Sequence, residues 1–126
     1  MQGLHLTGDL SECQCAPQRL TDPVLLQTLC LEAVAAAGLT WVNSLFHQFA
    51  PGSGITGVVL LAESHLAVHT WPEMGGVTLD VYVCNYGQDN SAKAHALFEA
   101  LVRCFVPRNV ARGNLLRGAV SERGAT

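Results

Sequence analysis

The chain has 126 residues and a mass of 13.4 kDa, which fits a single domain. It is 49% hydrophobic and 13% charged, against roughly 25% charged residues in a typical soluble domain. The high apolar fraction and a net charge of only -3 exclude a disordered chain. Between residues 33 and 88 the only charged side chains are Glu63, Glu73 and Asp80, and no Lys or Arg lies between residues 19 and 93. We expect this stretch to be mostly buried, with each acid hydrogen-bonded or functional.

The same composition argues against a membrane, secreted or nucleic-acid-binding protein. Polar residues, Pro51 and several glycines interrupt the uncharged run over residues 33–62, so this run does not predict a transmembrane helix. Residues 1–10 lack the basic and apolar regions of a signal peptide, and five cysteines leave at least one unpaired, so we expect reduced thiols and a cytoplasmic protein. Five arginines lie between residues 103 and 123, but the pI of 5.9 favours a solvated face there over a nucleic-acid site.

The hydrophobic pattern predicts elements in the order β-α-β-β-β-β-α-β. Thr21, Asp22 and Pro23 are typical of a helix start, and apolar residues at helical spacing follow until Gly38. Residues 77–84 alternate between apolar and polar side chains, which is typical of a strand with one buried face. The predicted strands are 4–10, 39–49, 55–62, 65–70, 77–84 and 106–111, the helices are 23–37 and 91–105, and a loop spans 71–76. Asn90 or Ser91 is expected to cap the second helix, and a polar tail follows residue 111.

Two helices and several strands joined by short turns predict an α+β fold. We expect a two-layer sandwich, with a mainly antiparallel sheet and both helices on one of its faces. The other face of the sheet also carries apolar residues, which a single domain of this size cannot cover alone. We therefore expect a homodimer that buries this face.

One segment, Glu63-Ser64-His65 followed by His69, combines residue types that can carry chemistry. A Ser with nearby His residues could act as a nucleophile with its base, although ordinary core and loop positions explain the same residues when the segment is taken alone. In an extended chain His65 and His69 lie ~13 Å apart on one face, so they cannot chelate one metal ion together. We expect no metal site.

The segment resembles a known family once its surroundings are included. Four runs stand at characteristic distances: Gly54-Ile55-Thr56-Gly57-Val58-Val59, Ala62-Glu63-Ser64-His65-Leu66, His69-Thr70-Trp71-Pro72-Glu73, and Asp80 with Cys84. This pattern resembles the short prokaryotic form of S-adenosylmethionine decarboxylase, a pyruvoyl-dependent family. Weaker similarity covers most of the chain.

The resemblance implies a proenzyme that cuts itself between Glu63 and Ser64. The Ser64 hydroxyl attacks the preceding carbonyl, and a hydroxyl donor stabilises the resulting oxyanion. The family places a Ser at the position of Thr56, which keeps this hydroxyl. His69 matches the residue that removes the Ser64 α-proton.

Cleavage would leave a β chain of residues 1–63 and an α chain of residues 64–126 that begins with a covalent pyruvoyl group. This ketone forms a Schiff base with the substrate amine and takes up the electrons that decarboxylation leaves behind. By resemblance, Cys84 returns a proton to the substrate, Phe49 stacks on adenine and Glu73 binds the ribose hydroxyls. The implied substrate is S-adenosylmethionine, and the product is the aminopropyl donor for spermidine synthesis.

Three departures from the family pattern lie near the expected pocket. Asn85 stands where Gly is usual after the Cys, and Met74 and Gly76 replace aromatic residues. The turn before Thr56 is one residue longer. These departures bear on the identity of the substrate more than on self-cleavage.

Two other functions therefore stay open. A pyruvoyl-dependent ornithine or arginine decarboxylase would use Glu73 or Asp80 to bind the distal cation of its substrate. A non-catalytic paralogue that binds a partner is a hypothesis of another class. The resemblance assigns no role to His65, and Asp80 either orients the site or bonds to a neighbouring strand. In every enzymatic version we expect a homodimer of processed protomers with sites near its interface.

Overall fold

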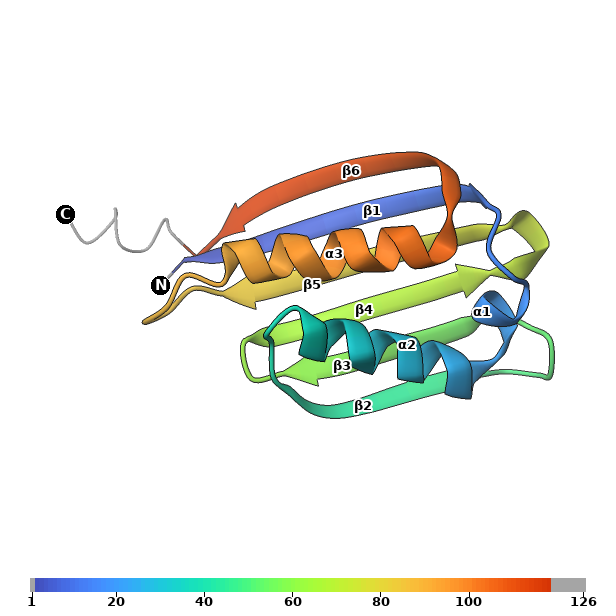
Figure 1. Ribbon diagram of the computed structural model, residues 1–126, viewed down its shortest axis with the longest axis horizontal. Coiled ribbons are helices and arrows are strands. Elements are labelled where there is room, and N and C mark those ends of the chain that lie inside the picture. Colours follow the sequence, from blue (N-terminus) through green and yellow to red (C-terminus); the bar gives the residue numbers. More distant parts are fainter. Residues whose placement is uncertain (1, 119–126) are drawn as a thin grey trace.

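The computed structural model describes residues 2–118 as one six-stranded sheet with helices on one side (Figure 1). The strands are β1 (Gly3–Cys13), β2 (Trp41–Gln48), β3 (Ile55–Leu61), β4 (Ser64–Trp71), β5 (Gly76–Cys84) and β6 (Pro107–Arg117). The helices are α1 (Gln18–Thr21), α2 (Pro23–Ala36) and α3 (Ser91–Phe105), and a 3-10 turn, η1, spans Pro72–Met74.

The sheet has the strand order β2-β3-β4-β5-β1-β6, and its neighbouring strands pair in antiparallel fashion. Helix α2 crosses the half of the sheet that contains β2, β3 and β4, and α3 crosses the half that contains β5 and β1 (Figure 1). Both helices lie on the same face. The predicted α+β sandwich with two main helices is confirmed.

Helix α2 begins where the local sequence predicts. The Asp22 side chain accepts the backbone N–H groups of Val24 and Leu25 at 3.0 and 3.2 Å, and Pro23 occupies the first helical turn. Gly38, at φ +82°, follows the helix and permits the chain to turn back toward the sheet. Within residues 2–118 no helix is long and apolar enough to cross a membrane.

Helix α3 is capped differently from the prediction. Asn90 is the N-cap residue, but its side chain makes no capping bond. The Asp89 carboxylate instead accepts the Ser91 N–H at 2.9 Å. This hydrogen bond lowers the pKa of Asp89. The Asn90 amide is directed toward the carbonyl of Cys84, so it holds the end of β5 rather than the helix.

Several element boundaries differ from the predicted ones. The predicted loop at 71–76 contains the 3-10 turn η1, and the short helix α1 was not predicted. Strand β6 runs to Arg117 instead of ending at residue 111, because β1 offers it a pairing partner along almost its whole length. The end of the predicted polar tail, residues 119–126, lies outside the described residues.

Side-chain alternation gives the sheet two different faces. In β3 and β5 every second residue is buried beneath the helices. The remaining side chains project from the opposite face, which no helix of residues 2–118 covers and which we call the open face. Leu45, Val58 and Leu60 lie together there, and each is at least 41% exposed. An apolar surface of this kind is typical of a protein interface.

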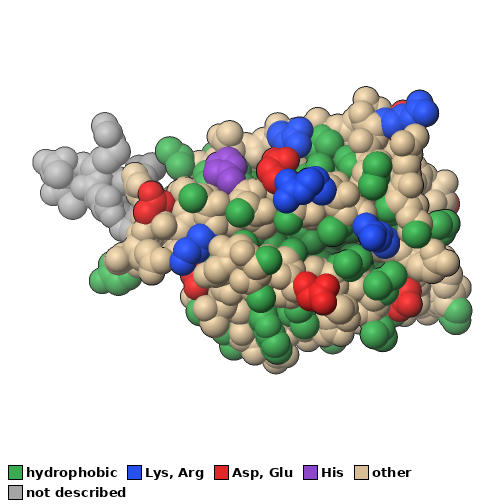
Figure 2. Space-filling model, in the orientation of Figure 1, with side chains coloured by type: hydrophobic (Ala, Val, Ile, Leu, Met, Phe, Trp, Pro, Cys, Tyr) green, Lys and Arg blue, Asp and Glu red, His purple; other side chains and the backbone are tan. Residues whose placement is uncertain are grey.

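Charged side chains are scattered over the helix-covered face. Figure 2 shows Lys and Arg side chains there that are separated from one another and interspersed with acidic ones. Arg112 of β6 forms a bidentate pair with Glu99 of α3, with N–O distances of 2.9 and 3.2 Å. This arrangement has the character of a solvated face.

Gly54, just before β3, lies so close to β4 that a side chain would collide. A Cβ on Gly54 would meet the backbone carbonyl oxygen of Thr70, which cannot swing aside as a flexible side chain can. We predict that Gly54→Ala lowers the free energy of unfolding by about 1–3 kcal/mol in urea denaturation. Gly76→Ala is the control, because its Cβ meets nothing closer than a carbonyl oxygen at 3.6 Å. Equal losses in both variants would contradict this account.

Candidate active site

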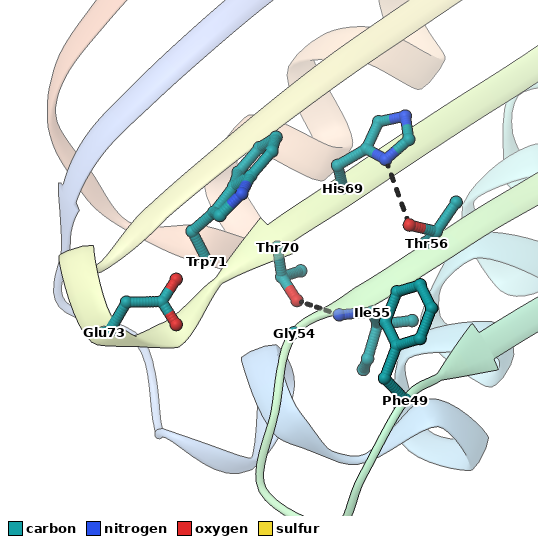
Figure 3. Close-up of a pocket in the computed structure, with 8 residues that line it drawn as sticks. All are labelled: Phe49, Gly54, Ile55, Thr56, His69, Thr70, Trp71 and Glu73. Atoms are coloured by element: carbon teal, nitrogen blue, oxygen red, sulfur yellow. Dashed lines mark hydrogen bonds between the residues drawn. The ribbon is translucent and has the colours of Figure 1, made fainter.

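A cavity of about 210 Å³ opens where β2 ends and the facing ends of β3 and β4 meet. It is lined by Phe49, Gly54, Ile55, Thr56, His69, Thr70, Trp71 and Glu73 (Figure 3). Four of these residues were predicted site residues, namely Phe49, Thr56, His69 and Glu73. The sheet therefore brings together one subset of the predicted site.

Thr56 and His69 form the polar pair of this cavity. They are direct cross-strand partners in β3 and β4, and both lie on the open face. Thr56 Oγ1 lies 3.3 Å from His69 Nδ1 (Figure 3). The Trp71 ring is tilted against the imidazole at a centroid distance of 5.9 Å. A hydroxyl hydrogen-bonded to an imidazole can donate to an oxyanion or take part in proton transfer.

Phe49 and Glu73 flank the same cavity from two different segments. Phe49 follows β2 and is 83% exposed, and the His47 ring packs edge-on against it with the ring centroids 4.5 Å apart. Glu73 lies in η1, and its carboxylate has no hydrogen-bond partner within residues 2–118. An exposed aromatic ring and an unpaired carboxylate beside one cavity can stack on a ring and accept hydrogen bonds from a ligand.

Ser64 lies in a strained segment of backbone. Ala62 and Glu63 form a two-residue turn between β3 and β4, and Ser64 pairs with Leu61 across it. Favoured turns of this length place turn residues at positive φ, but neither Ala62 nor Glu63 does so. Ser64 itself adopts φ 154°, which L-residues rarely do and which costs about 1–3 kcal/mol. The strain therefore falls on the Glu63–Ser64 junction.

The carbonyl before Ser64 is held by a backbone donor. The Cys84 N–H donates to the Glu63 carbonyl oxygen at 2.7 Å. The Glu63 carboxylate accepts the Thr40 N–H at 3.1 Å, and the Ala62 N–H donates to the Thr40 carbonyl at 2.8 Å. These bonds fix the turn at both ends, and the donor from Cys84 polarises the carbonyl that precedes Ser64.

Asn85 stabilises the loop that follows Cys84. Its side chain accepts the Asn90 N–H at 2.7 Å and donates to the Ser91 hydroxyl at 3.0 Å. The Asn90 amide in turn donates to the Cys84 carbonyl at 2.9 Å. A glycine at position 85 could make neither side-chain bond, so this departure from the family pattern has a structural role.

Burial affects the thiols of three cysteines, Cys13, Cys15 and Cys30. All five cysteines are free thiols. Burial raises the pKa of Cys30 to about 12 and that of Cys13 to about 11, and it also raises the pKa of Cys15. Thiols of such high pKa stay protonated near neutral pH. Residues 2–118 contain no group of three or more His, Cys, Asp or Glu side chains suited to a metal ion.

The predicted site residues form two separate groups within one chain. Ser64 and Cys84 lie at one end of β4 and β5, beside the turn. Thr56 and His69 lie toward the other end, with Phe49 and Glu73. His69 lies five positions after Ser64 along the extended strand, a span of ~17 Å. One chain alone does not bring the Ser64 group and the His69 group into contact.

A third group was not predicted as a unit. His5 of β1 lies 3.1 Å from Asp80 of β5, measured from Nε2 to Oδ1. The Tyr82 ring packs against His5 and against His65 of β4. Alternation along 77–84 indicates that Asp80 and Tyr82 share a face with Cys84, but no local signal indicates that β1 lies beside β5.

Relatives with the same sequence pattern are known. The profile of the S-adenosylmethionine decarboxylase family matches residues 4–118. The S-adenosylmethionine decarboxylase proenzyme of Thermodesulfovibrio yellowstonii is 37% identical over 121 residues, which cover 96% of this chain and 84% of the relative. The proenzyme of Parasynechococcus marenigrum is 44% identical over 84 residues, which cover 67% of this chain and 63% of the relative. The match to the proenzyme of Pseudomonas aeruginosa covers 54% of that relative. The chain therefore spans less than two thirds of the length of these two relatives.

A solved structure shares the architecture. The crystal structure of the adenosylmethionine decarboxylase from Aquifex aeolicus matches with a TM-score of 0.82 at 35% sequence identity, covering 92% of this chain and 90% of that chain. The family profile spans almost all of the described residues, and relatives above 30% identity cover more than two thirds of the chain. The chain belongs to the S-adenosylmethionine decarboxylase family.

Proposed function

We propose that this chain is a proenzyme that cleaves itself between Glu63 and Ser64 and then decarboxylates S-adenosylmethionine. The observation that carries the proposal is the strained Glu63–Ser64 junction, whose carbonyl accepts the Cys84 N–H at 2.7 Å. A nucleophilic hydroxyl, a polarised carbonyl and a strained backbone favour self-cleavage together. The relatives' common name, a decarboxylase proenzyme, supports the same conclusion.

Self-cleavage would begin with attack by the Ser64 hydroxyl on the Glu63 carbonyl carbon. The acyl group moves from the Ser64 nitrogen, which takes the hydroxyl proton, to the Ser64 oxygen. The Cys84 N–H already donates to the oxygen that becomes negative in this step. His69 would then take the Ser64 α-proton as Glu63 leaves as a carboxylate. Water finally releases the nitrogen as ammonia and leaves a ketone at residue 64.

His69 can act on Ser64 only if a second protomer supplies it, because ~17 Å of strand separates them within one chain. We propose a homodimer in which the two open faces pack together about a two-fold axis that crosses β4 near Ala67. Such an axis reverses the strand direction and brings the Ser64 end of one protomer opposite the His69 end of its partner. Leu45 and Val58, apolar and exposed on the open face, would be buried in this interface.

The ketone at residue 64 fits the role of an electron sink, because it would bind the substrate amine and delocalise the electrons of the broken bond. The remaining groups of the chain can position a nucleoside. Phe49 is free to stack on adenine, and the unpaired Glu73 carboxylate can accept hydrogen bonds from ribose hydroxyls. Cys84, whose backbone N–H donates to the Glu63 carbonyl, would return a proton to the substrate.

The departures from the family pattern are compatible with this substrate. Met74 and Gly76 do not line the cavity that contains Phe49 and Glu73. They line a separate hollow next to β1 instead. Phe49 and Glu73, the two side chains proposed to bind adenosine, thus line a cavity to which neither Met74 nor Gly76 contributes.

Self-cleavage and substrate are tested on the purified protein. We predict two chains, 1–63 and 64–126, by intact mass spectrometry, and one uncut chain near 13.4 kDa for Ser64→Ala. The processed protein should release labelled CO2 from carboxyl-labelled S-adenosylmethionine, and not from ornithine or arginine. Release from either amino acid would reject the substrate, and an uncut wild-type chain would favour a non-catalytic paralogue.

The Thr56 hydroxyl is tested by substitutions of similar shape. Thr56→Val removes the hydroxyl, and we predict that it slows self-cleavage about 10²- to 10³-fold, the effect of losing one oxyanion donor. Thr56→Ser keeps the hydroxyl and should cleave at nearly the wild-type rate. Time courses of chain cleavage on denaturing gels measure both rates. Similar rates for the Val and Ser variants would reject a role for this hydroxyl.

Sharing of the site between protomers is tested by mixing two defective chains. Ser64→Ala lacks the nucleophile, and His69→Ala lacks the proposed base. Co-expression should restore activity in mixed dimers, in which the intact Ser64 of one chain meets the intact His69 of the other. Each variant expressed alone should be inactive. No recovery in purified mixed dimers would mean that each site is built within one chain.

A further inference from the structure

Five side chains on the open face form a cluster that the proposed reaction does not use. This Tyr82 cluster consists of His5, His65, Asp80, Tyr82 and Arg117. His5 Nε2 and Asp80 Oδ1 are 3.1 Å apart. The Tyr82 ring lies between the two imidazoles at centroid distances of 5.7 and 5.6 Å, and the Arg117 guanidinium carbon lies 5.4 Å from its centroid. Groups from β1, β4 and β6 thus hold this ring of β5 in place.

The Tyr82 hydroxyl lies over Gly3 of β1, which is the cross-strand partner of Cys84 in β5. A Cβ on Gly3 would lie 2.8 Å from both the hydroxyl oxygen and Cε1 of Tyr82, so the phenol fills the space of the missing side chain. Gly3 and Cys84 are direct partners in the pairing of β1 with β5. Side chains of direct partners have Cβ atoms about 4.5–5.5 Å apart. The phenol therefore lies on the β1 side of Cys84, whose Sγ accepts the Tyr86 N–H at 3.4 Å.

The proposed reaction requires a proton source at this place. Decarboxylation replaces the substrate carboxylate with a proton, so Cys84 would give up one proton in each turnover. The thiolate that remains must be protonated again before the next turnover. In a dimer that covers the open face, bulk water would not reach Cys84 freely. The titratable groups around Tyr82 are His5 of β1, His65 of β4 and Asp80 of β5.

We propose that Tyr82 is a positioning residue for Cys84 that returns its proton after each turnover. The Tyr82 O–H bond breaks as the Cys84 S–H bond forms, and the phenolate takes a proton from the His5 imidazolium, which solvent restores. Asp80 holds the His5 imidazole beside the Tyr82 ring through their hydrogen bond. This inference rests on the proposed role of Cys84 as proton donor.

Tyr82→Phe tests the inference, because it keeps the ring and removes the proton. In the processed enzyme we expect unchanged self-cleavage, an unchanged KM for S-adenosylmethionine and a kcat about 10²-fold lower. Added imidazole, a small proton carrier, should restore much of the lost kcat. An unchanged kcat, a raised KM, or a lowered kcat that imidazole does not restore would each overturn the proposal.

Tyr86→Phe is the matched control, because Tyr86 is the second tyrosine of the chain and its side chain is exposed in the loop after β5. Tyr86→Phe should keep the wild-type self-cleavage, KM and kcat. If Tyr82→Phe does not fold, the isosteric Asp80→Asn takes its place, with a lower kcat at unchanged KM expected and an unchanged kcat overturning the proposal. A wild-type protein that releases no CO2 would reject the proposed function together with this inference, whereas an unaffected Tyr82→Phe rejects the inference alone.

Discussion

The hydrogen bond from the Cys84 amide to the Glu63 carbonyl connects the two reactions proposed for this chain. It joins the end of β5 to the turn between β3 and β4, and it places a donor on the bond to be cut. The same residue carries the thiol proposed for decarboxylation. The pairing of β4 with β5, in which Ser64 is the partner of Val83, determines where the Cys84 amide and the Cys84 thiol lie. A slip of one residue would move the thiol to the helix face and remove the amide from the carbonyl.

The length of β4 then determines how the site can be completed. Ser64 begins this strand, and His69 lies five residues further along it, so a single flat sheet keeps the two apart. Cys84 and His69 alternate with buried residues and so project from the open face, which no described helix covers. Packing two such faces in opposite directions is the simplest way for a chain of this size to bring the groups together. The same packing would bury the exposed apolar side chains that the isolated protomer leaves in water.

Local sequence signals predicted much of the fold, but they could not predict which distant strands pair with one another. Asp22 and Pro23 indicated the start of α2, and alternation along 77–84 indicated the two faces of β5. The family resemblance indicated the residues of the cavity. The contact between His5 and Asp80 could not be predicted, because it depends on β1 pairing with a strand more than seventy positions later in the chain. The strain at Ser64 was equally hidden, since Ala62 and Glu63 carry none of the Gly or Asn signals of a tight turn.

The charge-poor middle of the chain has a physical explanation in these contacts. Its three acids lie in different settings: Glu63 accepts a backbone N–H, Asp80 pairs with His5, and Glu73 is unpartnered within residues 2–118. The Glu73 carboxylate lies beside the cavity, and no Lys or Arg among residues 2–118 forms an ion pair that would compensate its electrostatic field. That field attracts a cation, whether a sulfonium or a diamino acid, and so does not by itself select between them. The exposed ring of Phe49 on the other side of the cavity provides a stacking surface, which a nucleoside can use and a short aliphatic chain cannot.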